Sequence, residues 1–523
     1  MNVFPAHDWV AHHAVHRPDA MALGCAEDGR RVTWSELDHR VGSLATVLAG
    51  LGVAKGDRIS VVSENDPRVF ELQFAAMRLG ALLVPLNWRL TVSELSDICI
   101  DAEPAVLVHD GTWEQSAKEI AHTAGIVHRL AWGAGPASDC TDYEAGVADS
   151  APRGPSSDIA LDDPTHILYT SGTTGRPKGA LSTNSTLIWH ALNNAHTTGT
   201  SEPGCHHLNP MPLFHAGGLH VMSNPILYFG GAVTTMTRFV PDKVLAALSG
   251  STPPITHFTA IPLMYAAIAA QPGFDDADLS RARNFTVAGA IATPELLQRW
   301  ADRGVPLQPQ YGGTEMGPMA TALDDQGAWL DKAKGGSTGR RAFHTDIRLV
   351  DSAGGDVPDG VTGEIWLRGP SITPGYWRKD SADFFTDGWF RTGDAARRDT
   401  DGFYYPAGRT KEMYKSGGEN VYPAEVENVM SLHPAVADFA VVGVPDEKWG
   451  EVGLAVLVAA SDNPPTLEQL HAFAADKLAR FKLPKHVVVV DELPRNVTGK
   501  VSRQALKELY GTIAVAPTEA EAR

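Results

Sequence analysis

The chain has 523 residues, of which 43% are hydrophobic, 20% charged and 8% aromatic. This composition is typical of an ordinary globular protein, and the length is too great for one hydrophobic core, so we expect two or more domains. The formal net charge of −18 opposes binding to phosphate backbones and anionic membranes, which disfavours nucleic acid as a partner.

The N-terminal segment and the cysteines indicate the compartment. Residues 1–19 lack the apolar core of a secretory signal, and the most apolar runs, such as 81–85 and 487–490, are far shorter than the roughly 20 residues that cross a bilayer. The four cysteines are Cys25, Cys99, Cys140 and Cys205. Their scattered positions, without C-x-x-C spacing, are typical of a reducing compartment. We therefore expect a cytoplasmic protein with no membrane span.

The first half of the chain alternates between strand and helix patterns. Thr33 and Glu36 have capping-box spacing ahead of a helical apolar period. We interpret the following segments as a β-α-β unit and two further strands: 58–63, 69–79, 81–85, 105–109 and 226–235. This alternation predicts a layered α/β fold with largely parallel sheets and crossover helices.

The composition of the chain changes at two places. A connector at 150–163 precedes the apolar strand 167–169, and charged residues and glycines crowd together at 408–420. After that boundary the patterns predict a small α+β domain. Its expected strands and helix are 437–444, 454–459, 467–479 (the helix) and 486–491.

Residues 170–179, Thr-Ser-Gly-Thr-Thr-Gly-Arg-Pro-Lys-Gly, combine hydroxyls, glycines and one lysine. Glycines let main-chain N–H groups approach an anion, Ser and Thr add donors, and Lys178 adds a positive charge, so the loop suits a polyphosphate. The spacing is not that of a Walker A motif. Composition alone leaves a plain surface loop as the alternative.

This loop resembles the signature of the AMP-forming acyl-CoA synthetase, luciferase and peptide-synthetase adenylation superfamily. Five more segments of that pattern follow in order: Pro212-Leu-Phe-His215, Tyr311-Gly-Gly-Thr-Glu315, Arg391-Thr-Gly-Asp394, Gly408-Arg-Thr-Lys411 and Pro494-Arg-Asn-Val-Thr-Gly-Lys500. The resemblance implies a large layered α/β N-terminal domain and a smaller α+β C-terminal domain, with the active site between them. We expect an ATP- and acyl-binding domain at 1–410, a mobile domain at 411–511 and a disordered tail at 512–523.

The resemblance implies that ATP, Mg²⁺ and coenzyme A (CoA) take part in the reaction. Joining a carboxylate to the α-phosphate of ATP supplies a good leaving group, AMP, in a reaction that depends on positioning and charge neutralisation. By resemblance, the phosphates are held by Thr170, Ser171, Gly172, Thr173, Thr174 and Lys178. Thr314 touches phosphate and Glu315 binds Mg²⁺, which prefers oxygen ligands.

Further roles follow from the same resemblance. Tyr311 lies along the adenine, with Gly289 and Ala290 close to the base, while Asp394 accepts hydrogen bonds from the ribose and Arg409 assists at the ribose or phosphate. Alone, each of these residues would more often be a core or turn residue, so their roles depend on the motifs.

The expected catalytic set is completed by two mobile or reorienting groups. Lys500 bridges the carboxylate and α-phosphate during adenylation, and His215 flanks the acid. Lys411 occupies the hinge position, about which the small domain rotates before thiol attack. The CoA candidates are Gly417, Gly418, Trp449, Phe481 and Lys482. Leu483 stands where some relatives carry a phosphate-binding Arg, which leaves the nucleotide contacts to CoA open.

The His after Pro212-Leu-Phe resembles acyl- and aryl-activating members and not amino-acid adenylating ones, so we expect an apolar fatty or aromatic acid. The candidate pocket walls are Trp189, Ala216, Gly217, Ile261, Gly312, Met316 and Gly317, where the three glycines are expected to leave room for a ring or chain.

Several alternatives stay open at this stage. The acyl group could pass to a carrier protein instead of CoA, a luciferase-type oxygenase belongs to the same superfamily, and a nucleotide-binding protein without catalysis is a different class. A metal site at Cys205, His206 and His207 is a further alternative to satisfied core histidines. The expected partners are small molecules, and a homodimer is compatible with the resemblance.

Overall fold

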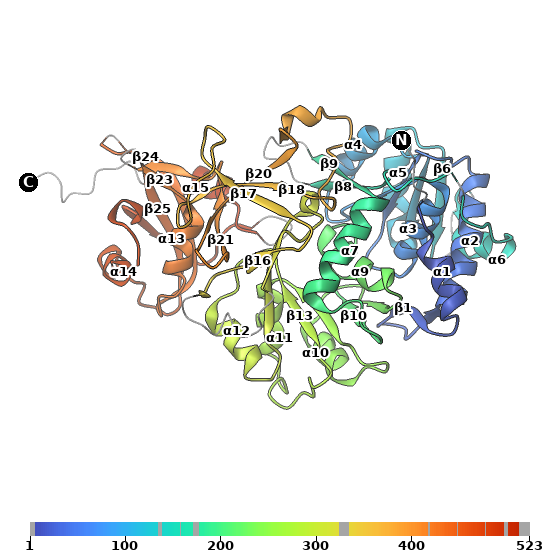
Figure 1. The fold of residues 1–523 in the computed structure, drawn as a ribbon, viewed down its shortest axis with the longest axis horizontal. Coiled ribbons are helices and arrows are strands. Elements are labelled where there is room, and N and C mark those ends of the chain that lie inside the picture. Colours follow the sequence, from blue (N-terminus) through green and yellow to red (C-terminus); the bar gives the residue numbers. More distant parts are fainter. Residues whose placement is uncertain are drawn as a thin grey trace, which may run out of the picture. The chain divides into compact units, whose positions relative to one another are not determined.

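The computed structural model describes residues 6–133, 139–156, 158–170, 177–323, 334–416, 419–446, 448–475, 477–495 and 500–511. The chain divides into two compact units (Figure 1). Unit 1 comprises residues 1–335, 339–346 and 367–390, and unit 2 comprises 336–338, 347–366 and 391–523. The expected boundary at residues 410 and 411 therefore lies within unit 2. It stays a prediction about which part of the chain moves, since compactness does not identify a pivot.

Unit 1 contains a nine-stranded sheet in its described part. In spatial order its strands are β16 (Arg340–Arg341), β15 (Thr321–Ala322), β14 (Leu307–Tyr311), β13 (Asn284–Val287), β12 (His257–Ala260), β10 (His206–Asn209), β11 (Ala232–Thr235), β1 (Met21–Cys25) and β2 (Arg31–Thr33). The strands from β14 to β1 pair in parallel, so their carboxyl ends meet at one edge.

A seven-stranded sheet is the second layer of unit 1. Its order is β7 (Thr141–Asp142), β6 (His128–Trp132), β5 (Val106–Asp110), β3 (Arg58–Val62), β4 (Leu82–Pro85), β8 (Pro164–Thr170) and β9 (Lys178–Thr183). All neighbours pair in parallel except β8 with β9. The predicted β-α-β unit is confirmed, with α3 (Arg68–Leu79) between β3 and β4.

Helices separate and cover these sheets. They are α1 (Trp9–His16), α2 (Trp34–Gly50), α4 (Val92–Ala102), α5 (Glu114–Ala124), α6 (Tyr143–Asp149), α7 (Asn184–Thr198), α8 (Ala216–Leu219), α9 (Ser223–Tyr228), α10 (Pro241–Gly250), α11 (Pro262–Ala269) and α12 (Pro294–Ala301). The predicted capping box at Thr33 and Glu36 is present at the start of α2. On β3, Val61 packs into a core with α2 and α3, and Val62 packs into a core with α4 and α5.

The strand expected at 226–235 is wrong in its first half. Ile226 lies in α9, and β11 begins only at Ala232. Gly230 and Gly231 separate the two elements; the backbone at Gly230 has φ +78°, and a Cβ at Gly231 would lie 2.6 Å from the carbonyl oxygen of Cys205. An apolar run of this length fits a buried helix or a strand equally well, which is why the pattern misled.

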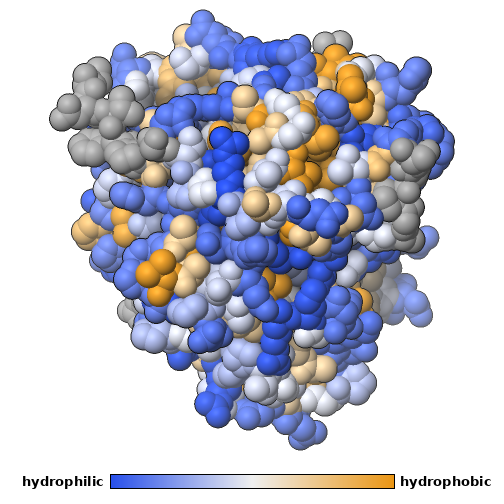
Figure 2. All heavy atoms as spheres, turned by 90° about the vertical axis from the view of Figure 1, so that its right-hand side faces the viewer, coloured by the Kyte–Doolittle hydropathy of each residue, from blue (hydrophilic) through white to orange (hydrophobic). Residues whose placement is uncertain are grey.

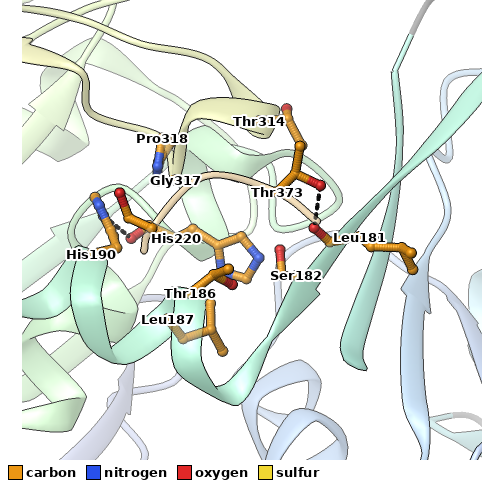
Figure 3. A pocket seen from close by; sticks show the side chains of 11 residues that line it. Leu181, Ser182, Thr186, Leu187, His190, His220, Thr314, Gly317, Pro318 and Thr373 are labelled. Carbon is orange, nitrogen blue, oxygen red and sulfur yellow. Dashed lines mark hydrogen bonds between the residues drawn. The ribbon is translucent and has the colours of Figure 1, made fainter. Parts of the chain in front are cut away.

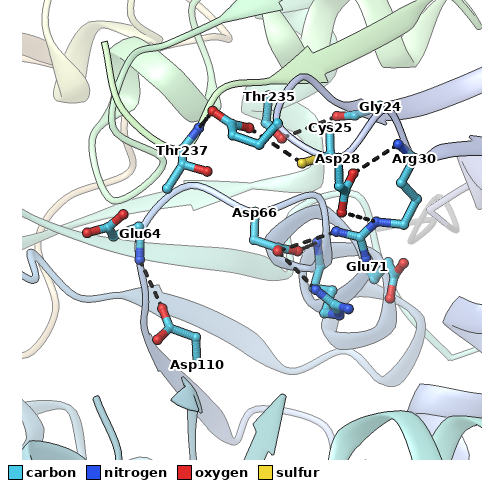
Figure 4. Close-up of polar contacts among 12 residues, drawn as sticks. Gly24, Cys25, Asp28, Arg30, Glu64, Asp66, Glu71, Asp110, Thr235 and Thr237 are labelled. Carbon is cyan, nitrogen blue, oxygen red and sulfur yellow. Dashed lines mark hydrogen bonds and ion pairs between the residues drawn. The ribbon is translucent and has the colours of Figure 1, made fainter. Parts of the chain in front are cut away.

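The N-terminal hairpin is joined to α3 by charged groups (Figure 4). The Arg30 guanidinium pairs with Asp28 and, at 3.5 Å, with Asp66, and Asp66 also accepts a hydrogen bond of 2.9 Å from Arg68 at the start of α3. The turn after β3 is therefore held in place, and this turn carries Asn65, which contacts the site described below.

Unit 2 is built around a sheet of five strands with helices on both faces. Its order is β23 (Glu419–Val421), β22 (Tyr414–Ser416), β25 (Gly450–Ala459) and β24 (Val436–Asp446), with β26 (His486–Val489) also paired with β25. The helices are α13 (Pro423–Met430), α14 (Leu467–Ala474) and α15 (Arg503–Tyr510). The predicted small α+β architecture is confirmed, although the helix expected to reach residue 479 ends at Ala474.

Another sheet lies mostly in unit 2. It contains β17 (Asp346–Val350), β18 (Gly363–Arg368), β20 (Trp389–Arg398) and β19 (Phe385–Thr386), and β21 (Tyr404–Arg409) pairs with β20. The face of the molecule in Figure 2 is mainly hydrophilic, with apolar side chains in small groups. No helix in the described ranges is long and apolar enough to cross a membrane.

Candidate active site

Loops at the carboxyl edge of the nine-stranded sheet carry many of the predicted site residues. Ile261 follows β12, Gly289 follows β13 shortly after its end, and Tyr311 ends β14. These strands are parallel neighbours, and a Cβ at Gly289 would lie 3.2 Å from Cγ2 of Ile261. The residues expected beside adenine and the acid therefore emerge side by side at the edge where parallel α/β sheets bind ligands.

The turn after Tyr311 packs closely against backbone. A Cβ at Gly312 would lie 1.7 Å from the carbonyl oxygen of Pro318, and one at Gly317, where φ is +74°, would lie 2.2 Å from the carbonyl oxygen of Ser371. A side chain at either position would clash with the backbone, which explains why both residues are glycines. That they also leave room for the acid stays a prediction.

Glu315, in the 3₁₀ turn η2 (Thr314–Met316), is the centre of a polar cluster in unit 1. Its Oε1 accepts hydrogen bonds from the Tyr376 hydroxyl at 2.8 Å and from Thr170 Oγ1 at 3.4 Å. Thr170 and Lys178 are register partners across β8 and β9. The fold thus joins three predicted residues that lie far apart in the sequence.

Tyr376 also organises the predicted phosphate-binding lysine. Lys178 Nζ lies 5.8 Å from the centre of the Tyr376 ring and 4.7 Å from that of Phe384, both attractive cation–π distances. Tyr376 was not among the predicted residues. The only signal was its place in the run Gly-Tyr-Trp between the matched segments. Ser171, Gly172, Thr173 and Thr174 lie outside the described residues.

The donor set of this cluster suits a hard cation and a polyphosphate. The carboxylate of Glu315 and the hydroxyls of Thr170 and Thr314 are oxygen ligands of the kind that Mg²⁺ takes. Lys178 supplies a positive charge on the adjoining strand. With a cation held by these oxygens, the cluster would offer two positive charges to a nucleotide phosphate, one from the ion and one from Lys178.

The segment that carries His215 is fixed by a buried asparagine. Asn65 donates hydrogen bonds to the carbonyl oxygens of Met211 at 2.9 Å and Met236 at 3.0 Å, and it accepts one from the N–H of Leu213 at 2.9 Å. The exposed His215 then precedes α8, and its Nδ1 accepts a hydrogen bond of 3.0 Å from Gly217 N–H. In a neutral imidazole this places the proton on Nε2.

The other residues predicted to line the acid pocket do not form one cluster. Ala216 and Met316 are buried, and Gly217 lies beside His215. The Trp189 ring, on α7, packs edge-on against His344 with centroids 4.9 Å apart.

The alternative metal site at Cys205, His206 and His207 is not supported. His206 hydrogen-bonds with the Pro253 carbonyl oxygen at 3.1 Å and with Thr234 Oγ1 at 2.8 Å. His207 Nδ1 contacts the His257 carbonyl oxygen at 3.3 Å. Burial lowers the pKa of His206 to about 4 and that of His207 to about 3. These are buried, neutral histidines of β10.

In unit 2, Asp394 and Arg409 form a direct pair. They are register partners on β20 and β21, and Arg409 Nε lies 2.6 Å from Asp394 Oδ1. The Asp394 side chain is 14% exposed and that of Arg409 50%. Both can therefore be reached by a ligand, and the guanidinium orients the carboxylate that was predicted to bind ribose.

Lys411 lies on an exposed turn directly after β21. The next residue, Glu412, accepts a hydrogen bond of 2.7 Å from Arg503 Nε, and Arg503 also binds Glu427 through two bonds of 2.9 Å. The segment that follows the predicted hinge is thus tied to α15. Lys500 is exposed, and it stands next to Val501, which bridges Arg495.

The predicted CoA residues have mixed environments. Gly417 and Gly418 lie outside the described residues. Ser416 pairs with Gly450, so Trp449, which is 42% exposed, lies close to the end of β22. Phe481 and Lys482 lie in the 3₁₀ turn η5 (Arg480–Lys482), and Lys482 forms an ion pair with Glu425.

Comparison with known proteins identifies the family. The model of the AMP-binding enzyme family matches residues 10–377, and that of the AMP-binding enzyme C-terminal domain matches residues 425–500. Feruloyl-CoA synthase from Amycolatopsis sp is 38% identical, with 96% of this chain and 98% of that protein covered. Indoleacetate–CoA ligase from Aromatoleum aromaticum is 37% identical, with 96% and 97% covered.

A solved structure agrees with these matches. The crystal structure of ATP-bound MatB from Rhodopseudomonas palustris superposes with a TM-score of 0.86 at 30% identity and covers 97% of this chain and 99% of that one. ATP and CoA are substrates of the AMP-forming CoA ligases in this family. The chain therefore belongs to the AMP-binding enzyme family and is an AMP-forming acyl-CoA ligase.

Proposed function

We propose that the chain activates an apolar carboxylic acid, fatty or aromatic, as an acyl-adenylate and then transfers the acyl group to free CoA. The cluster of Thr170, Lys178 and Glu315 around Tyr376 is the observation that carries this proposal, because it combines an oxygen ligand set with a cation. The feruloyl and indoleacetate ligases, at 38% and 37% identity, support an aromatic acid.

The reaction has two steps, in each of which one bond to the attacked atom forms and one breaks. In the first, a carboxylate oxygen attacks the α-phosphorus of ATP, the bond between the α-phosphorus and the bridging oxygen breaks, and pyrophosphate leaves. In the second, the sulfur of CoA attacks the acyl carbon, its proton is lost, and the bond to AMP breaks. Lys500 stabilises the charge that develops in the first step. Asp394, oriented by Arg409, holds the ribose.

Mg²⁺ is the metal that these ligands favour. Glu315 would hold it, with hydroxyl oxygens of Thr170 and Thr314 nearby, and the bound ion would neutralise charge on the phosphates of ATP. Tyr376 keeps the Glu315 carboxylate oriented through its 2.8 Å hydrogen bond. His215 lies beside the acid, and its Nε2–H can donate to a carboxylate oxygen.

Free CoA as the acceptor is supported by the exposed Trp449 in unit 2, a surface on which an adenine can stack. The assignment to the cytoplasm is supported by the absence of disulfides: all four cysteines are free thiols.

The test is a panel of fatty, aryl and amino acids incubated with ATP, Mg²⁺ and CoA, with AMP and pyrophosphate measured. We expect AMP formation that depends on an apolar acid, with acyl-CoA formed in equal amount. ADP as the product would contradict the mechanism. If pyrophosphate is released but no acyl-CoA forms, and a phosphopantetheinylated carrier protein becomes acylated instead, the acceptor is a carrier protein and not CoA. Nucleotide binding without any cleavage would identify a non-catalytic binder.

A further inference from the structure

A small cavity in unit 1 is lined in part by Thr314 and Gly317 of the turn after β14. Its volume is about 10 Å³, close to the space needed by one water-sized oxygen. Residues from β9, α7 and the turn line it, and the His220 imidazole lies near their centre (Figure 3). The lining residues are Leu181, Ser182, Thr186, Leu187, His190, His220, Thr314, Gly317, Pro318, Ser371 and Thr373. The cavity thus shares Thr314 and Gly317 with the predicted phosphate and acid sites.

His220 presents a hydrogen-bond donor there. Gln73 Nε2 donates to Asn224 Oδ1 at 2.8 Å, so the Asn224 amide faces His220 with its NH₂ group, 2.8 Å from Nδ1. His220 Nδ1 is therefore the acceptor and Nε2 carries the proton. Nε2 is buried and has no partner. The side chain is 3% exposed, and an unsatisfied N–H at such a site is costly.

Ser371 contributes a second unsatisfied group. It is 1% exposed, and its Oγ also has no partner within the structure. The lining holds no Asp, Glu, Lys or Arg. Burial and the neighbouring histidines His166, His190 and His215 hold the pKa of His220 well below its usual value, so the cavity is polar and neutral. A carboxylate or an ammonium would lose its hydration there without a counter-charge.

We propose that this cavity is the far end of the acid-binding pocket and that His220 Nε2–H and Ser371 Oγ bind a neutral oxygen substituent of the substrate, a hydroxyl, ether or keto oxygen remote from the carboxylate. This inference rests on the proposed function and narrows its substrate class. It selects oxygenated apolar acids over plain hydrocarbon acids, because an acid without the oxygen leaves both groups unpaired. It also selects against dicarboxylic acids.

The test uses whichever scaffold the acid panel shows to be adenylated fastest. Each position remote from the carboxylate is compared as hydrogen, methyl, hydroxyl and carboxylate by kcat/KM for pyrophosphate release. At one position we expect hydroxyl to exceed methyl by about tenfold, with carboxylate no better than methyl. Ser371→Ala and His220→Gln should each lower the hydroxyl-to-methyl ratio about fivefold and leave the rate with the methyl acid nearly unchanged.

Ser60→Ala is the matched control, because Ser60 is an equally buried serine on β3 that does not line the cavity. Its hydroxyl-to-methyl ratio should equal that of the wild type. Should His220→Gln unfold, Ser371→Ala, which removes a single oxygen, decides the outcome. A ratio near one at every position in the wild type, or a wild-type ratio in the folded variants, would overturn the inference while leaving the ligase activity intact. Absence of AMP with every acid would refute the proposed function itself.

Discussion

Tyr376 connects the carboxylate and the lysine of the proposed phosphate site, and its hydroxyl can be removed without disturbing the ring. In Tyr376→Phe the cation–π contact with Lys178 remains, but Glu315 loses its 2.8 Å hydrogen bond. We expect pyrophosphate release to slow about tenfold and the Mg²⁺ concentration for half-maximal rate to rise, because the carboxylate is no longer held in one orientation. Titration of Mg²⁺ against the rate of pyrophosphate release measures both effects.

A matched control separates this role from general damage. Tyr143 also donates to a carboxylate, Glu71 Oε2, at 2.7 Å, and it lies on α6. Tyr143→Phe should lower stability but leave the Mg²⁺ dependence unchanged. If Tyr376→Phe has the Mg²⁺ response of the wild type, Tyr376 has no positioning role.

The pair of Asp394 and Arg409 allows a second test at this scale. Arg409→Gln removes the guanidinium that lies 2.6 Å from Asp394, so the carboxylate that we propose to bind ribose loses its orientation. We expect KM for ATP to rise about tenfold with a smaller change in KM for the acid. Arg398, which lies on the same strand as Asp394, forms a similar pair with Asp359. Arg398→Gln should leave KM for ATP unaltered, and equal effects of the two variants would contradict the assignment.

Short motifs identified residues of the proposed nucleotide site that the fold brings together, but not the residues around them. Thr170 and Lys178 belong to a loop whose composition suits phosphate binding, Glu315 was assigned by the family resemblance, and the fold brings the three together. Tyr376 could not be predicted, because its partner Glu315 is 61 positions away and pairing at that distance depends on tertiary packing. The close backbone contacts of Gly312 and Gly317 could not be predicted either, since a sequence does not show which backbone passes a glycine.

Among the secondary-structure elements, β10 and β12 bury an unusual set of titratable groups. Burial lowers the pKa of His206 and His257 to about 4 and that of His207 to about 3. Below pH 6.5 these histidines are protonated in the unfolded chain, whereas in the folded protein they stay neutral until about pH 4 or lower. Stability is therefore lost as pH falls through this window, by about 1.4 kcal/mol per pH unit for each histidine.

We therefore expect the thermal unfolding midpoint to fall steeply between pH 6.5 and pH 4.5. His207→Asn should reduce this pH-dependent drop by roughly the share of one histidine, whatever it does to stability at pH 7.5. His196→Asn is the control, because His196 is exposed on α7. A drop unchanged by His207→Asn would show that other groups govern the acid sensitivity.

Helix and strand predictions depended on how many signals agreed at each element. The capping box at Thr33 and the helical period behind it agreed, and α2 begins there. At 226–235 only an apolar run was available, and the boundary between α9 and β11 depends on the close approach of Gly231 to Cys205, a tertiary contact. Local consistency, more than hydrophobicity, decided which predictions were confirmed.

For the whole molecule, composition and length correctly predicted a large and a small part, but not that they interleave. Residues 336–338 and 347–366 belong to unit 2, although the chain returns to unit 1 at 367–390. A boundary drawn from a change in composition cuts the chain once, whereas β17 and β18 share a sheet with β20 and β21, which come later in the chain. The pivot predicted at Lys411 does not depend on where the units divide, because it requires only that the backbone can rotate at that residue.

The hinge proposal predicts that substitutions of Lys411 and of Lys500 affect the two half-reactions differently. Lys411→Pro fixes φ near −65° at the proposed joint and should cut overall turnover at least about tenfold while one half-reaction persists, since alternation is blocked. Lys411→Ala leaves the backbone free and should behave like the wild type.

Lys500→Ala should slow adenylation about a hundredfold yet spare thiol attack on preformed acyl-adenylate, because only the first step develops charge beside its ammonium. Lys507→Ala, an exposed lysine on α15, serves as the control. Equal losses in both half-reactions for Lys500→Ala would refute the division of labour, and undiminished turnover in Lys411→Pro would exclude the pivot.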